Sequence, residues 1–91
     1  MKTARIKGGF WKQQPDIIIK EENGYAYIGN MSFKREDLKA ITTSPQVVHG
    51  IVPIGFTKIS FLGNGVELGF IAIRAKAISK MLPEIRKYFN L

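Results

Sequence analysis

Two Asn-Gly pairs constrain the fold of this chain more than any other feature. Asn23-Gly24 separates the run Asp16 to Glu22 from Tyr25 to Ile28, and Asn64-Gly65 separates Thr57 to Leu62 from Val66 to Ile73. A two-residue type I′ turn needs positive φ at both central residues, and asparagine and glycine tolerate that conformation best. Each pair therefore predicts a tight hairpin, and the chain is expected to form antiparallel sheet.

Alternating apolar residues support these strands, since Ile17 and Ile19 fall on one face of the first hairpin, as do Ile59 and Phe61 in the second. Further strands are less sharply marked. Gly29-Asn30 predicts a third tight turn into a strand from Met31 to Lys34, and Leu38 to Thr43 favours a turn followed by a strand, although Phe33, Leu38 and Ile41 also fit a short helix. Ser44 to Gly55, with two prolines and two glycines, is expected to be a loop with one short strand at Gln46 to Val52.

The period changes to a helical one at the end of the chain. From Arg74 to Phe89 the apolar residues Ile78, Met81, Leu82, Ile85 and Phe89 recur at spacings that place them on one face. Pro83 removes the amide that would bond back to Ser79, so a kink or a new short turn is expected there. The sequence therefore predicts one amphipathic C-terminal helix with these apolar residues in the core.

The 91 residues suffice for one domain, spanning 1–91. We predict an α+β, mostly β fold: an antiparallel sheet, or a partly open barrel, closed by the C-terminal helix. The chain has no cysteine, which excludes disulfides and thiolate metal sites and fits a reducing cytosol, so a cytoplasmic protein is expected. Its apolar runs are too short for a membrane-spanning helix.

Three segments resemble the small bacterial pleckstrin-homology-like domains. They are the run MSFKREDLKAI from Met31 to Ile41, the hairpin around Gly63-Asn64-Gly65, and AISKMLPEI from Ala77 to Ile85. The resemblance implies a β-barrel closed by one helix and a binding scaffold rather than an enzyme. Two departures from the lipid-binding members stand out: the closing helix carries no tryptophan, and Glu21 and Glu22 follow Lys20 where a phosphorylated head group would need cations. Phosphoinositide binding is therefore not expected.

The charge of +7 is concentrated at the two ends of the chain. The first twelve residues carry +4, Arg74 to Leu91 carry +4, and the middle carries −1. Chain ends often lie close together, so both could contribute to one positive surface that binds an acidic partner. The predicted partner-binding residues are Arg5, Lys7, Trp11, Lys12, Arg74, Lys76, Lys80 and Lys87, with Arg86 beside them.

The inventory of catalytic residue types is poor. His49 is the one histidine and lies in the expected loop, and the acidic residues show no acid/base spacing. We therefore predict no enzyme activity, catalytic residue, metal site or cofactor. At the N-terminus, Phe10 and Trp11 alternate with cations, which suits either a first core strand or rings that stack on nucleic acid bases. Gly8-Gly9 in that strand predicts a bulge or a close backbone approach.

We therefore expect a non-enzymatic binding module or regulatory protein whose basic face docks on an acidic protein partner. Two alternatives use the same charges. One is nucleic-acid binding through the basic and aromatic residues, with Trp11 stacking on bases. The other is peripheral association with an anionic membrane, for which each lysine near the surface contributes about 1 kcal/mol. The oligomeric state is not predicted.

Overall fold

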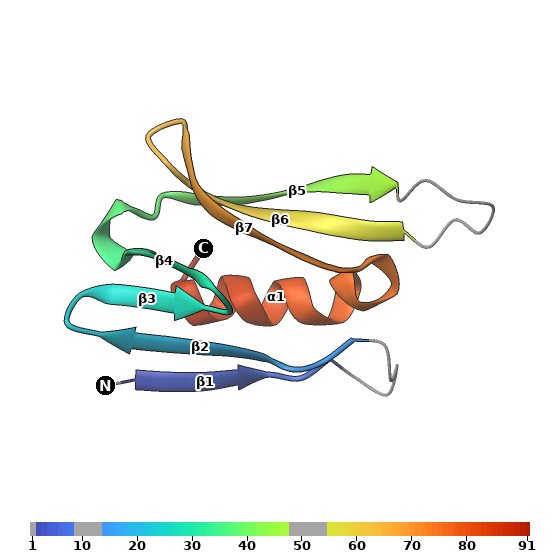
Figure 1. The fold of residues 1–91 in the computed structure, drawn as a ribbon, viewed down its shortest axis with the longest axis horizontal. Coiled ribbons are helices and arrows are strands. Elements are labelled where there is room, and N and C mark those ends of the chain that lie inside the picture. The colour runs from blue at the N-terminus through green and yellow to red at the C-terminus, as the bar shows by residue number, and fades with distance from the viewer. Residues whose placement is uncertain (1, 9–13, 48–54) are drawn as a thin grey trace.

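A computed structural model describes residues 2–8, 14–47 and 55–91, with residues 45–47 described through their backbone (Figure 1). The strands are β1 (Lys2–Ile6), β2 (Ile17–Glu22), β3 (Tyr25–Ile28), β4 (Met31–Lys34), β5 (Ala40–Val47), β6 (Gly55–Gly63) and β7 (Val66–Arg74). One-turn 3₁₀ helices occupy Arg35–Asp37 and Ala75–Ala77, and the helix α1 spans Ile78–Phe89. The expected α+β, mostly β fold is confirmed.

The strands form two antiparallel sheets (Figure 1). Sheet A has the order β1-β2-β3-β4, and sheet B has the order β5-β6-β7. No pairing joins β4 to β7 or β1 to β5 in the described residues, so the sheets are not closed into a barrel. Of the two predicted architectures, the structure therefore has open sheets covered by the C-terminal helix.

The hairpin turns are those expected from the Asn-Gly pairs. Asn23 and Gly24 have φ values of 53° and 82°, and Asn64 and Gly65 have φ values of 51° and 80°. These positive angles belong to the type I′ geometry that matches the twist of paired strands. The third expected turn and the strand after it also form, as β4 follows β3 directly.

The segment after β4 combines both structures that its sequence allows. The 3₁₀ turn at Arg35–Asp37 turns the chain, and β5 begins at Ala40. Strand β5 continues to Val47, so the single long strand replaces the separate strand expected at Gln46 to Val52. The rest of that expected strand, and His49, lie outside the described residues.

The C-terminal helix begins at Ile78 rather than at the predicted Arg74, because Ala75–Ala77 forms a 3₁₀ turn between β7 and the helix. Helix α1 is continuous through Pro83. The carbonyl that Pro83 leaves without a helical donor belongs to Ser79, and both residues are exposed, so water can satisfy it. The helix ends at Asn90, whose φ of 59° is left-handed.

One core joins the two sheets and the helix. The Phe33 ring of sheet A lies 5.6 Å from the Phe61 ring of sheet B, and the Phe89 ring of α1 lies 6.3 Å and 6.0 Å from these two, measured between centroids. Met81 and Ile85 are also fully buried. Ile78 and Leu82, which were predicted as core residues, are only partly buried because they lie at the edges of the helix's apolar face.

Candidate binding surface

The two ends of the chain meet, because β1 and α1 contact each other. The Lys2 ammonium lies 4.5 Å from the centroid of the Tyr88 ring, and the Tyr88 hydroxyl donates a 2.6 Å hydrogen bond to Glu21 of β2. Burial and this bond to a carboxylate raise the pKa of Tyr88 well above its usual range. The N-terminal strand and the closing helix thus form one structural unit.

Arg5 and α1 nevertheless lie on opposite faces of sheet A. Side chains alternate along β1, and Ile6 is buried on the face that α1 covers, so Arg5 projects from the other face. There Arg5 Nη1 lies 3.1 Å from Asp16 Oδ2. Lys7, two positions further on, is exposed and makes no ion pair within the described part of the chain.

The Asp16 carboxylate also accepts a 3.0 Å hydrogen bond from the Gly8 backbone amide. That bond, with the Arg5 side chain, holds the pKa of Asp16 below its usual range. A Cβ atom at Gly8 would overlap the Gln14 backbone carbonyl, so the expected close backbone approach is present. Arg5 therefore stabilises the start of β2, and its charge is already balanced.

On the exposed face of α1, Lys80 and Lys87 make no ion pair in the described structure. Glu84 lies between them along the helix, four residues after Lys80, but forms no ion pair with Lys80. Lys76 is exposed on the 3₁₀ turn that precedes α1. Lys80 and Lys87 present their charge to solvent from a regular helix.

The arginines near α1 have internal partners instead. Arg86 Nη2 donates to the Ile41 carbonyl at 2.9 Å, and Arg35 Nη2 donates to the Phe89 carbonyl at 2.8 Å, so both tie the helix to the sheets. The Arg74 guanidinium lies 4.6 Å from the centroid of the Phe56 ring, and its buried Nε has no hydrogen-bond partner among the described residues. Arg86 is therefore held in place by a hydrogen bond, and Arg74 by its contact with the Phe56 ring.

Phe10, Trp11 and Lys12 lie outside the described residues, so the role predicted for the aromatic N-terminal segment stays a prediction. Of the other predicted binding residues, Lys7, Lys76, Lys80 and Lys87 are exposed. A joint binding role for the two ends of the chain also stays a prediction.

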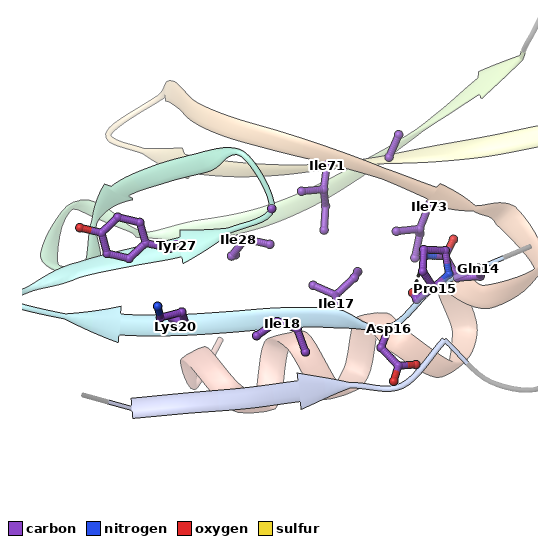
Figure 2. Close-up of a pocket in the computed structure, with 12 residues that line it drawn as sticks. Gln14, Pro15, Asp16, Ile17, Ile18, Lys20, Tyr27, Ile28, Ile71 and Ile73 are labelled. Carbon is purple, nitrogen blue, oxygen red and sulfur yellow. Dashed lines mark hydrogen bonds between the residues drawn. The ribbon is translucent and has the colours of Figure 1, made fainter.

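A groove that the sequence did not reveal runs between the two sheets (Figure 2). Its volume is about 440 Å³, and it lies between Ile17 and Ile18 of β2 and Ile71 and Ile73 of β7. The side chains of Tyr27 and Lys20 line it near the end of β3, as Figure 2 shows. Further lining residues are Gln14, Pro15, Asp16, Ile28, Gly29 and Ala72.

The apolar rim of this groove is exposed. Ile18 and Tyr27 are 36% and 40% exposed, values that stand out in a domain whose core isoleucines are almost fully buried. A sequence signal existed: three consecutive isoleucines from Ile17 to Ile19 put one on the solvent face whichever register the strand takes. The missing information was where the second sheet would lie.

No metal-binding arrangement accompanies the groove among the described residues. Within residues 2–8, 14–47 and 55–91, histidine, cysteine and carboxylate side chains form no group able to hold a metal ion. Among those same residues, no helix is both long and apolar enough to cross a membrane. No family model, curated protein or solved structure matches this chain significantly.

Proposed function

We propose that this protein is a non-enzymatic binding module that docks on an acidic surface of a protein partner. The observation that carries the proposal is the distribution of ion pairs. Asp16, Glu21 and Glu67 are each engaged by cations of this chain, at 3.1 Å, 3.7 Å and 3.1 Å for Arg5, Arg35 and Lys58. Lys80 and Lys87 on the exposed surface of α1 form no such ion pair in the described structure, and with Glu84 between them they leave a net positive charge there.

The rigidity of α1 supports this role. Arg35 and Arg86 anchor its C-terminal half, and Phe89 is buried against Phe33 and Phe61. Lys80 and Lys87 therefore extend from a backbone that need not be ordered when a partner binds, which lowers the entropic cost of association. The resemblance to pleckstrin-homology-like domains, which mostly serve as binding scaffolds, adds further support.

A pull-down from the source cell, with the captured proteins identified and the strongest candidate then purified and titrated, tests the proposal. The double variant Lys80→Glu/Lys87→Glu should weaken binding by about tenfold or more, because each reversal replaces an attraction by a repulsion at the contact. Lys34→Glu/Lys39→Glu is the matched control, since it makes the same charge change at exposed positions outside α1. Equal weakening by both double variants would indicate that the net charge of the protein, and not the position of the lysines on α1, determines binding.

The same variants are titrated with a single-stranded oligonucleotide and with phosphatidylserine vesicles. Tight binding of the oligonucleotide, with a steep salt dependence, would indicate that the partner is a nucleic acid and not a protein. Binding of vesicles alone would replace it by an anionic membrane. No loss of partner binding in Lys80→Glu/Lys87→Glu would remove α1 from the interface and contradict the proposal.

A further inference from the structure

Strand β7 is an edge strand whose outer backbone groups are open. In the described part of the chain, it pairs with β6 on one side and with no strand on the other. The Arg74 amide donates a 2.7 Å hydrogen bond to the Gln14 side chain, so it points away from β6. Because outward groups alternate along an antiparallel strand, the N–H and C=O groups of Phe70 and Ala72 also point outward. Within the described residues, they have no backbone partner.

Sheet A leaves this edge uncovered. Met31 of β4 packs against β7 at Gly69, where a Cβ atom would overlap the methionine sulfur. Next to this contact, a second hollow of about 460 Å³ lies along Gly69 to Ala72. It shares Ile28, Gly29, Ile71 and Ala72 with the first hollow, so one groove follows β7 from Gly69 to Ile73.

The opposite wall of the groove is a second exposed edge. The register pairs Ile19 with Ile28, the last residue of β3, so Ile17 and Ile18 extend past β3 and pair only with β1. Figure 2 shows Ile17 and Ile18 of β2 on one side and Ile71 and Ile73 of β7 on the other. The groove has the form of a slot between two strands, with apolar side chains on both walls.

The charges at this slot favour an acidic occupant. Lys20 lies on the wall, is exposed and makes no ion pair in the described structure. Asp16, also at the slot, is already engaged by Arg5 and by the Gly8 amide. Lys20 is thus the one cation among the described lining residues, and the one lining carboxylate, Asp16, is neutralised locally.

We propose that an extended segment of the protein partner, with alternating acidic and apolar residues, adds to β7 as a further strand. Its backbone pairs with the outward groups of Phe70 and Ala72, and its apolar side chains lie between the isoleucines of β2 and β7. An acidic side chain contacts Lys20. This mode of strand addition derives affinity from backbone bonds and selectivity from alternate side chains. It rests on the proposed function and specifies the partner's binding segment.

Isotope-labelled protein is titrated with a short peptide of alternating glutamate and valine. The amide resonances of Phe70 and Ala72 should shift, and their exchange with solvent should slow by about tenfold at saturation, because each gains a hydrogen bond. Ala72→Pro removes one outward donor and should weaken binding by about tenfold, whereas Ala72→Ser keeps the amide and should bind as wild type. Lys20→Glu should weaken binding by about fivefold.

A peptide N-methylated on alternate residues gives the same test on wild-type protein, should Ala72→Pro fail to fold. Equal binding of the N-methylated peptide, equal binding of a lysine-valine peptide, or no binding at all would each overturn strand addition. A dimer that forms through β7, seen by sedimentation and lost in Ala72→Pro, would make a second copy the occupant and also overturn it.

The outcomes separate this inference from the proposed function. If the purified partner loses affinity for Lys80→Glu/Lys87→Glu but binds Ala72→Pro as tightly as wild type, α1 remains the docking surface and strand addition is wrong. If the glutamate-valine peptide binds β7 but no acidic partner loses affinity for the α1 variants, strand addition at the slot is supported and the proposed role of α1 is wrong.

Discussion

Replacing Ile85 by alanine should destabilise the domain strongly, because Ile85 is fully buried on α1, the element that joins both sheets to the core. The substitution removes about three carbon groups, and at about 0.8 kcal/mol for each buried group the lost transfer free energy is about 2.4 kcal/mol. The cavity left behind adds to this, and the total should be about 3 to 4 kcal/mol.

Denaturation in urea, followed by far-ultraviolet circular dichroism, measures this loss. The whole domain is expected to have a free energy of unfolding of about 5 to 14 kcal/mol, so the variant should still fold and give a measurable transition. The midpoint of thermal unfolding should fall by roughly 20 °C. Ser79→Ala, on the exposed side of the same helix, is the control and should change the free energy by less than about 0.5 kcal/mol.

A loss below about 1 kcal/mol in Ile85→Ala, with an unchanged dependence on urea, would refute the reasoning. It would mean that the site collapses without a cavity or that α1 contributes little to the cooperative unit. A large loss accompanied by a smaller urea dependence would instead indicate that the helix had detached while the sheets stayed folded.

Three further predictions address local contacts. The pKa of Asp16 is lowered, so the stability that its carboxylate contributes should be present above the usual carboxyl pKa and be lost as the pH falls through the folded-state pKa. In an acid titration, Asp16→Asn should therefore lose less free energy of unfolding than the wild type. The pKa of Tyr88 is raised, so the stability that its hydroxyl contributes should be fully present below the usual tyrosine pKa and be lost as alkaline pH ionises the hydroxyl. Tyr88→Phe should lower the free energy of unfolding by about 1 kcal/mol at neutral pH, and its stability should fall less than that of the wild type at alkaline pH. Gly63→Ala would place a Cβ against the Asp37 carbonyl and should cost about 1 to 3 kcal/mol in urea denaturation, whereas at Gly55 the nearest atom is Ala75 Cβ at 3.5 Å and alanine should be tolerated. A matching loss at both glycines would contradict the clash argument.

Features set by neighbouring residues could be predicted from the sequence. The turns at Asn23-Gly24 and Asn64-Gly65 form because positive φ is a local property of those residue pairs. The buried face of α1, with Met81, Ile85 and Phe89 at its centre, follows from helical periodicity. The start of the helix was wrong by one 3₁₀ turn, as element boundaries depend on the packing of the adjoining strand.

The roles of charged residues were harder to predict, because a cation's partner depends on which distant backbone lies beside it. Arg86 and Lys87 are neighbouring cations on α1, yet Arg86 binds the Ile41 carbonyl and Lys87 faces solvent. Likewise, Arg5 belongs to the basic N-terminal segment, but strand alternation directs it to Asp16 on the face opposite α1. Charge counting along the chain identified which segments carry the excess positive charge, but not where that charge lies on the folded surface.

The sequence by itself determined the β-hairpins, the amphipathic helix and the surplus of positive charge, since each follows from residue type and short-range spacing. Only the tertiary structure decided that the sheets stay open and that β7 keeps a free edge opposite Ile17 and Ile18. Sheet closure depends on how far β4 can follow β7, and Met31 of β4 packs on Gly69 without strand pairing between β4 and β7 among the described residues. The physical reason is that strand pairing between sheets is a long-range geometric condition, which local propensity and periodicity do not encode.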